Sequence, residues 1–379
     1  MKIVLTGGGT GGHFYPLVAI AERIKEVARE RRLIEPRIYY IAPSKYDEQV
    51  LFENQIEFIQ SPAGKLRRYA SILNVLDIFV TATGFVWSLL MLYRLMPDVI
   101  ISKGGYASVP TVLAGAVFGI PIIIHESDAK PGRANLFLAG FATRIGIAWE
   151  SARAFFPAKL HDRIALIGIP LRKDLEHIDK DGARQYLGLE VGIPTILILG
   201  GSSGSRVINE TILAALPSLI SFSQIIHQTG EQAFKEIDGT ARVVMGESEH
   251  ATRYHPFAFL NMLALKRSAG IADIIISRAG STAIAEIALW AKPAILIPIP
   301  ESISHDQKTN AYTYAHTGAA TVLEEQNLTS NLLVSEIKRI LHNPELASDM
   351  SEKSKTFRYA DAAAVIATEA IDIALSHEK

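Results

Sequence analysis

The chain has 379 residues, of which 49% are hydrophobic and 20% charged, and its formal net charge is −1. This length exceeds the usual size of one domain, and the apolar fraction excludes a disordered protein, so two well-buried domains are expected. The small net charge argues against a nucleic-acid partner. The chain has no cysteine, which excludes disulfides, thiolate nucleophiles and cysteine-ligated zinc.

A glycine-rich turn follows the first expected strand, residues 3–5. It contains Gly7, Gly8, Gly9, Gly11 and Gly12. Beyond Pro16, apolar residues recur at helical spacing, at Leu17, Ile20, Ala21, Ile24, Val27 and Ala28. A strand, a glycine turn and a helix N-terminus aim backbone N–H groups at one point, so this stretch is predicted to bind a phosphate or a sugar.

Two other interpretations of this turn are weaker. Gly7, Gly9 and Gly12 satisfy the dinucleotide fingerprint, but that fold requires an acidic residue at the end of the second strand. The second strand expected here, residues 37–42, leads instead into Pro43 and Ser44. A tight turn without a ligand would not need five glycines. A nicotinamide or flavin cofactor is therefore not expected.

Apolar, β-rich segments alternate with helical patterns along the whole chain. The further strands are expected at residues 98–102, 121–125, 163–167, 195–200, 224–228, 273–277 and 294–298. Continuous apolar strands of this kind indicate parallel sheets that are covered by helices on both faces.

The strand and glycine-turn pattern restarts at residues 197–205, with a second helix expected at 206–216. The predicted fold class is therefore α/β, with two doubly wound, Rossmann-like domains. The first should comprise residues 1–170 together with a C-terminal helix at 357–379, and the second residues 171–356. Ligands of such sheets bind beyond the carboxyl ends of the strands, so the two domains are expected to face an interdomain cleft.

A third anion site is predicted at residues 274–290, where a strand, a turn at Gly280 and a helix follow one another, with Glu286 near the helix start. The segment Asp179-Lys180-Asp181 mimics the Asp-x-Asp pair of metal-dependent sugar transferases, but it lies in a polar stretch typical of a solvated loop. No metal and no other cofactor is expected, since helix dipoles and Arg172 could neutralise a diphosphate.

Seven blocks, taken together, resemble the MurG family of glycosyltransferases, which have the two-domain GT-B fold. They are GGGTGGHFYP (7–16), SKGGYASVP (102–110), IIIHESDAKPGRAN (122–135), GIPLR (168–172), GGSSGSRVIN (200–209), SRAGSTAIAEI (277–287) and HDQKTNA (305–311). The resemblance implies an inverting transfer of N-acetylglucosamine from its UDP donor to the muramoyl C4 hydroxyl of undecaprenyl-diphosphate-linked muramoyl-pentapeptide (lipid I), which forms lipid II. The alternative is a UDP-N-acetylglucosamine 2-epimerase of the same fold.

The resemblance also implies the donor site. Residues that would line the sugar and diphosphate are Thr10, Gly11 and Gly12, with Arg172 and Ser202 near the phosphates. Leu260 would present its backbone to the uracil from a loop expected at residues 257–268. The helix start around donor phosphate and ribose would comprise Ser281, Thr282, Ala283, Ile284, Ala285 and Glu286. Gln307 would contact hydroxyls of the transferred sugar.

On the acceptor side, the resemblance implies roles for His13, Glu126 and Asp128. His13 and Glu126 are the expected catalytic residues, and the sequence leaves open which of the three is the general base. An imidazole titrates near neutrality, which suits proton removal by His13. The commonest family form has Asn where this chain has Asp128. His125 ends a buried strand and is expected to be structural.

The most apolar region, residues 66–96, predicts association with an anionic membrane. Its uncharged stretch, residues 78–93, has about sixteen residues, fewer than the roughly twenty that a spanning helix needs. Flanking cations include Lys65, Arg67, Arg68 and Arg94, beside Ile72, Leu73, Leu76, Phe79 and Trp87. A peripheral protein of the cytoplasmic face is expected, and a core helix is the alternative. The short first strand gives no sign of a signal peptide.

Overall fold

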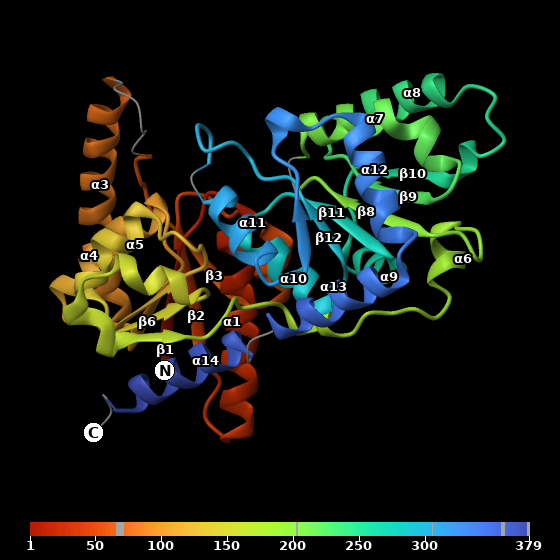
Figure 1. Ribbon diagram of the computed structural model, residues 1–379. Helices are drawn as coiled ribbons and strands as arrows, with labels where there is room; N and C mark the ends of the chain where they lie inside the picture. The colour runs from red at the N-terminus through yellow and green to blue at the C-terminus, as the bar shows by residue number, and fades with distance from the viewer. Residues whose placement is uncertain (66–71, 202–203, 305, 358–360, 377–379) are drawn as a thin grey trace. The chain divides into compact units, whose positions relative to one another are not determined.

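The computed structural model describes residues 1–65, 72–201, 204–304, 306–357 and 361–376, without the side chains of residues 72–74. Its contacts divide the chain into two compact units. Unit 1 comprises Met1–Arg172 and Tyr359–Lys379, and unit 2 comprises Lys173–Arg358. Each unit has one parallel sheet with helices on both faces (Figure 1).

The sheet of unit 1 has the strand order β3-β2-β1-β4-β5-β6-β7, and all of its pairs are parallel. Its strands are β1 (Lys2–Thr6), β2 (Arg37–Ala42), β3 (Ile56–Gln60), β4 (Val99–Ser102), β5 (Ile122–Glu126), β6 (Arg144–Ile147) and β7 (Ile164–Leu166). The helices are α1 (Gly11–Glu30), α2 (Glu48–Glu53), α3 (Ile72–Leu95), α4 (Val109–Val117), α5 (Arg133–Leu138) and α14 (Ala362–Ser376).

Alternation along β1 shows how this sheet is covered on both faces. Ile3 and Leu5 belong to one apolar cluster with residues of α1 and α14, whereas Val4 packs into a second cluster with α4 and α5. Successive side chains of a strand point to opposite faces, so an unbroken apolar strand serves both layers. This explains why α14, from the far end of the chain, belongs to unit 1.

The sheet of unit 2 has the order β10-β9-β8-β11-β12-β13, again entirely parallel. Its strands are β8 (Thr195–Leu199), β9 (Gln224–Gln228), β10 (Tyr254–Phe257), β11 (Ile274–Ser277), β12 (Ala294–Leu296) and β13 (Ala320–Val322). The helices are α6 (Ala183–Leu187), α7 (Arg206–Ile220), α8 (Phe234–Met245), α9 (Met262–Ile271), α10 (Ser281–Trp290), α11 (Gln307–Ala315), α12 (Ser330–Leu341) and α13 (Pro344–Thr356).

In both sheets the strand order reverses direction at a central pair, β1 with β4 in unit 1 and β8 with β11 in unit 2. Doubly wound sheets bind ligands beyond the carboxyl ends of such strands. Each of the two glycine turns, after β1 and after β8, therefore lies at this edge of its own sheet. The start of α10, after β11, lies at the same edge of the unit 2 sheet.

The expected loop at residues 257–268 is wrong. Helix α9 begins at Met262, and the Asn261 side chain caps it by accepting a hydrogen bond of 2.9 Å from the N–H of Ala264. The sequence interpretation missed this cap, although an asparagine directly before a helix is a common N-cap. The C-terminal helix also begins later than expected, at Ala362, where Asp361 accepts from the N–H of Ala364.

Candidate active site

Two tyrosine side chains, Tyr40 and Tyr106, lie against the glycine turn of unit 1. The Tyr40 hydroxyl donates to the carbonyl oxygen of Gly7 at 2.7 Å. Gly9 has a φ of 100°, in the left-handed region, and a Cβ there would lie 3.2 Å from the Tyr106 ring. Thr10 precedes the first residue of α1, and this fixes the turn directly before the helix N-terminus.

His13 lies in the first turn of α1. Its Nδ1 is 2.9 Å from the Thr10 hydroxyl. Loss of hydration and the nearby Lys103 lower the pKa of His13 to about 4, and Asp128 opposes them. The imidazole is therefore neutral at physiological pH, the form that can accept a proton.

Glu126, at the end of β5, is 3% exposed. Its carboxylate accepts hydrogen bonds from Asp128 N at 2.8 Å, Gly132 N at 3.0 Å and Asn135 Nδ2 at 2.9 Å. Burial and Asp128 raise its pKa to about 7, against these hydrogen bonds and Lys103. This geometry favours a carboxylate that orders the loop after β5. A catalytic role for Glu126 stays a prediction.

Lys103 was not singled out from the sequence. It follows β4, is 2% exposed, and its ammonium donates to the Ser127 hydroxyl. The sequence did contain a signal for Lys103, because this lysine stands in the block SKGGY directly after a buried strand. Tyr40 was missed as well, because its partner Gly7 lies 33 residues away in sequence. Asn135 was also missed, although it stands in the block IIIHESDAKPGRAN.

The other unit 1 residues assigned to the donor lie around α1. Gly11 and Gly12 are its first two residues. Arg172, at the end of unit 1, lies 3.6 Å from Glu22 of α1, measured from Nε to Oε1. Its guanidinium thus already has a carboxylate neighbour. His125 is fully buried with Nε2 2.8 Å from the carbonyl oxygen of Gly168, as expected for a structural residue.

In unit 2, α10 begins after Gly280, where a Cβ would meet nothing within 4 Å. The Thr282 hydroxyl in its first turn is buried and has no hydrogen-bond partner among the described residues. Ile284 is fully buried, and its N–H donates to the carbonyl oxygen of Gly280. Ile284 therefore anchors the helix start rather than presenting a side chain to a ligand.

Glu286 follows within the second turn of α10, and Ala283 and Ala285 are partly exposed. Loss of hydration raises the pKa of the Glu286 carboxyl to about 7. Within the described part of the chain, its side chain makes no hydrogen bond that could offset this loss. A ligand with hydroxyl donors would supply one.

Gln228, at the end of β9, connects two loops at the same edge, and sequence reasoning missed it. Its side-chain amide donates to the carbonyl oxygen of Gly201 at 3.1 Å and accepts from the N–H of Leu260 at 3.0 Å. The backbone donor of Leu260 is therefore engaged. Ser202 lies outside the described residues. A buried glutamine that ends a strand was the missed signal.

Gln307 is the first residue of α11, and its side-chain oxygen accepts from the N–H of Ile299 at 3.1 Å. This bond leaves the side-chain NH₂ group as the part of Gln307 that can contact a sugar.

The remaining polar candidate, the Asp179-Lys180-Asp181 segment, is a turn in which Asp179 pairs with Arg267 at 3.1 Å. Over the described ranges, no cluster of three or more His, Asp or Glu side chains could hold a metal ion.

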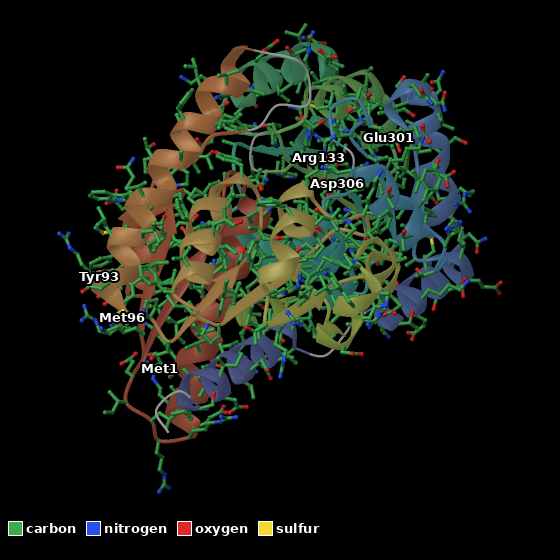
Figure 2. The ribbon with its side chains drawn as sticks, turned by 90° about the vertical axis from the view of Figure 1, so that its left-hand side faces the viewer. Met1, Tyr93, Met96, Arg133, Glu301 and Asp306 are labelled. Atoms are coloured by element: carbon green, nitrogen blue, oxygen red, sulfur yellow. The ribbon has the colours of Figure 1, made fainter. Side chains whose placement is uncertain are left out.

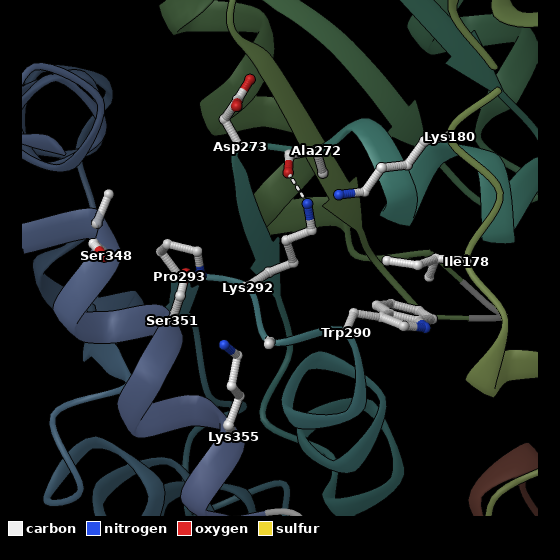
Figure 3. A pocket seen from close by; sticks show the side chains of 12 residues that line it. Ile178, Lys180, Ala272, Asp273, Trp290, Lys292, Pro293, Ser348, Ser351 and Lys355 are labelled. Atoms are coloured by element: carbon white, nitrogen blue, oxygen red, sulfur yellow. Dashed lines mark hydrogen bonds between the residues drawn. The ribbon is translucent and has the colours of Figure 1, made fainter. Parts of the chain in front are cut away.

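Unit 2 also has a pocket of about 400 Å³ at the opposite edge of its sheet (Figure 3). Asp273 and Pro293, which line it, directly precede β11 and β12. Lys292 crosses it and donates to the carbonyl oxygens of Gly270 and Ala272 at 3.2 and 2.6 Å. The pocket thus lies at the amino ends of the strands and is separate from the α10 start.

The outer surface of α3 is unusually apolar (Figure 2). We call the α3 surface the following exposed side chains: Val75, Leu76, Ile78, Phe79, Val86, Trp87, Leu90 and Tyr93. Phe79 is 65% exposed and Tyr93 68%. The segment Val75–Leu95 has a mean hydropathy of 1.9, and by length and composition it could cross a membrane. The uncharged stretch counted from the sequence is shorter, because it excludes Asp77 and Arg94. Arg67 and Arg68 lie outside the described residues.

Comparison with known proteins covers both units. Residues 3–147 match the glycosyltransferase family 28 N-terminal domain, and residues 195–366 match the family 28 C-terminal domain. A Bacillus anthracis protein named UDP-N-acetylglucosamine–N-acetylmuramyl-(pentapeptide) pyrophosphoryl-undecaprenol N-acetylglucosamine transferase 2 is 35% identical, covering 91% of this chain and 92% of its own. A Treponema denticola transferase of the same name, without the number, is 31% identical over 97% of this chain and 94% of its own.

Solved structures share the fold. The crystal structure of Acinetobacter baumannii MurG matches with a TM-score of 0.71 at 23% identity, over 98% of this chain and 99% of that one. A Listeria monocytogenes structure described as a UDP-N-acetylglucosamine 2-epimerase matches with a TM-score of 0.70 at 13% identity, over 100% and 96%. The chain therefore has the two-domain GT-B fold. The two family 28 domains, together with relatives above 30% identity along most of the chain, show that it belongs to the MurG family of glycosyltransferases.

Proposed function

We propose that this hexosyltransferase moves N-acetylglucosamine from UDP-N-acetylglucosamine to the muramoyl C4 hydroxyl of lipid I and so forms lipid II for peptidoglycan. The full-length relatives carry this activity in their names. The observation that carries the proposal is the α10 start, where a buried Thr282 hydroxyl and the Glu286 carboxyl lack partners among the described residues. Polar groups of this kind gain most from a ligand rich in hydroxyls and phosphate.

On the donor side, the N-terminus of α10 and the Thr282 hydroxyl bind the UDP phosphates, and Glu286 accepts hydrogen bonds from the ribose hydroxyls. Backbone donors and the positive end of the helix dipole favour the negative charge that develops on the leaving diphosphate. The NH₂ group of Gln307 contacts hydroxyls of the transferred sugar. Arg172, which already pairs with Glu22, adds positive charge near the same phosphates.

On the acceptor side, His13 acts as general base. Its neutral imidazole takes the proton of the C4 hydroxyl while that oxygen attacks C1 of the donor sugar. The bond between C1 and the diphosphate oxygen breaks, and the electron pair leaves with UDP, so the anomeric configuration inverts. The glycine turn and α1, which hold His13 next to Thr10, position this base.

The competing activity is 2-epimerisation of UDP-N-acetylglucosamine, since an epimerase shares the fold. Incubation of the pure protein with UDP-N-acetylglucosamine, with and without a lipid I analogue, separates the two. We expect UDP release and a disaccharide product that both depend on the acceptor. Formation of UDP-N-acetylmannosamine without acceptor would overturn the proposal.

We also propose that the α3 surface docks unit 1 on the anionic, cytoplasmic face of the cell membrane, where a lipid-linked acceptor is located. Apolar side chains beside cations bind such interfaces. The other face of α3 belongs to unit 1: Leu92 is fully buried, the Ser88 hydroxyl contacts that of Ser61, and Lys2 donates to the carbonyl oxygen of Leu95. These contacts favour docking over spanning.

Flotation with anionic and with neutral liposomes tests this docking. The wild type should float with anionic vesicles, and the Arg67→Glu, Arg68→Glu variant should float less. The matched control reverses the same amount of charge on unit 2, at Arg206 and Arg242, which are exposed on α7 and α8. Binding that ignores both lipid charge and the Arg67 and Arg68 changes would overturn the docking proposal.

A further inference from the structure

His227 is a fully buried histidine in β9, and none of the proposed donor contacts involves it. Both of its ring nitrogens have partners: Nδ1 lies 2.9 Å from the Tyr254 hydroxyl, and Nε2 lies 3.1 Å from Oδ1 of Asn209. Burial lowers the pKa of His227 to about 3, so the imidazole is neutral and has one N–H. His227 therefore connects β9 to β10 and to α7.

The Asn209 side chain determines which ring nitrogen carries this proton. Its NH₂ group donates to the carbonyl oxygen of Thr229 at 3.0 Å, and a carbonyl oxygen can only accept. Oδ1 of Asn209 therefore faces His227, so Nε2 of the ring must donate to it. Nδ1 then accepts from the Tyr254 hydroxyl. We call these four residues, Tyr254, His227, Asn209 and Thr229, the His227 network.

Thr229 is the point where this network reaches the glycine turn after β8. Gly204 of that turn has a φ of 74°, in the left-handed region. A Cβ on Gly204 would clash with the carbonyl oxygen of Thr229, the same oxygen to which Asn209 donates. The N–H of Thr229 donates to the carbonyl oxygen of Phe257 at 2.9 Å. The turn therefore packs against a residue whose own position is fixed by hydrogen bonds on both sides.

The same turn is also held at its other side. Gln228 donates from its side chain to the carbonyl oxygen of Gly201 at 3.1 Å. Gln228 and Thr229, two consecutive residues at the end of β9, thus contact the turn at Gly201 and at Gly204. Asn209 lies on α7, the helix that follows the turn, so its bond to Thr229 also holds the helix start against the sheet. A turn that is ordered before a ligand arrives loses less entropy on binding.

We propose that Asn209 and His227 are positioning residues of the donor site, which hold the glycine turn after β8 in the shape that donor binding requires. His227 orients the Asn209 amide, and the amide fixes Thr229 against the turn. Both side chains are at most 1% exposed, so they act through the turn and not on the donor itself. The inference rests on the proposed function, in which this edge of unit 2 binds UDP, but the hold on the turn belongs to the free protein.

The first test needs only the free wild type. Long-range proton–nitrogen NMR spectra of the histidine rings, with the His227→Gln variant for assignment, report which nitrogen of His227 is protonated. We expect the Nε2–H tautomer at neutral pH. The Nδ1–H tautomer would mean that the Asn209 amide is oriented the other way, and it would overturn the proposal.

The second test is Asn209→Leu, which removes both hydrogen bonds of the amide and keeps a side chain of similar size. The Gly204 N–H donates to the carbonyl oxygen of Gly201 at 3.1 Å within the turn, so its hydrogen exchange reports the order of the turn. In the free variant this exchange should become roughly tenfold faster. Calorimetry should show a UDP affinity lower by about fivefold, which corresponds to the loss of one neutral hydrogen bond.

Gln224→Leu is the matched control. Gln224 is a fully buried amide at the opposite, amino end of β9, where it donates to the carbonyl oxygens of Glu190 and Ile193 at 3.0 Å each. This variant should lower the unfolding midpoint at least as far as Asn209→Leu does. Its Gly204 exchange and its UDP affinity should nevertheless stay within about twofold of the wild type, because distant sites act independently.

Three results separate the possible failures. Equal losses of UDP affinity in Asn209→Leu and Gln224→Leu would make Asn209 only structural and would overturn the proposal. Unchanged Gly204 exchange in Asn209→Leu would overturn it as well. A wild type that does not bind UDP would overturn the proposed function alone, since the His227 tautomer and the Gly204 exchange are read without a ligand. The tautomer also tests the network if Asn209→Leu does not fold.

Discussion

The carboxyl edges of the two sheets share a topology but differ in how their polar groups are satisfied. In unit 1, Glu126 accepts three hydrogen bonds, Lys103 binds Ser127, and His13 contacts Thr10. In unit 2, the Thr282 hydroxyl is buried without a partner among the described residues, and loss of hydration alone raises the pKa of Glu286.

This difference in how polar groups are satisfied suits two chemical roles, proton transfer and ligand binding. A proton-transfer site works best when its charges are fixed before the substrate arrives, because no reorganisation is then needed during the reaction. A binding site gains affinity from polar groups that only the ligand satisfies, since a buried unsatisfied group costs about 1–3 kcal/mol. This contrast supports the proposal that unit 1 controls a proton and unit 2 binds the donor. Four substitutions test this division.

His13→Ala should lower turnover by roughly a hundredfold or more, the scale of a lost acid–base group. UDP affinity should stay unchanged, since His13 belongs to the preformed edge of unit 1. Steady-state kinetics with a lipid I analogue and calorimetry with UDP measure the two quantities. His161→Ala is the control, because it removes a unit 1 histidine whose Nε2 lies near the carbonyl oxygen of Phe156 and not near Thr10. Near-normal turnover of His13→Ala would make His13 structural.

Glu286→Ala should weaken UDP binding by about tenfold or more, as expected for hydrogen bonds to a charged group. In the wild type, UDP affinity should rise as the pH increases through about 7, because the ribose hydroxyls donate to the ionised carboxylate. Calorimetry at pH 6 and pH 8 measures this dependence, and Glu286→Gln should abolish it. An affinity that is independent of pH in the wild type would place the ribose elsewhere.

The free protein should show the opposite pH trend in stability. Folding raises the pKa of Glu286 from 4.5 to about 7, so between these values the folded state keeps a proton that the unfolded state has released. Stability therefore falls as the pH rises through this window, by up to about 3 kcal/mol, and partial exposure reduces the loss. Denaturant unfolding at pH 5 and pH 8 should show a smaller fall in Glu286→Gln than in the wild type.

Gln307→Ala should mainly degrade the choice of sugar. A site that pairs with a hydroxyl discriminates strongly between epimers, so competition between UDP-N-acetylglucosamine and UDP-N-acetylgalactosamine should lose roughly tenfold in selectivity. The affinity for UDP alone should change by less than about twofold. If calorimetry shows UDP affinity falling as far as in Glu286→Ala, Gln307 contacts the nucleotide and its assignment is wrong.

Thr282→Val should have the smallest effect, a loss of about threefold in UDP affinity, which corresponds to one neutral hydrogen bond. Protein stability should rise by about 1 kcal/mol or more, because the substitution removes a buried hydroxyl that has no partner among the described residues. Ser268→Ala is the matched control: its hydroxyl is also buried and without a described partner, but it lies on α9. A clear loss of stability in Thr282→Val would reveal an internal partner.

The sequence predicted much of the fold, since periodicity and glycine placement are local. Strands β2 and β9 have the expected ends, and α7 begins at Arg206 as expected. The missed strands β3, β6, β10 and β13 are short or mix polar residues with apolar ones, as in Tyr254–Phe257, which contains a histidine and a proline. The sheet pairs them through backbone hydrogen bonds, which leave little signal in side-chain pattern.

For the site, the sequence alone predicted the candidate residues for phosphate and sugar chemistry: the glycine turn, His13 after it, and a helix start near Glu286. The charges around these residues depend on how the chain folds. Lys103, Glu126 and Asp128 follow or end β4 and β5, and the parallel pairing of these strands brings them to one edge of the sheet, where Lys103 and Glu126 are buried. A pKa depends on burial and on neighbours in space, and neither is written in the spacing of residues along the chain.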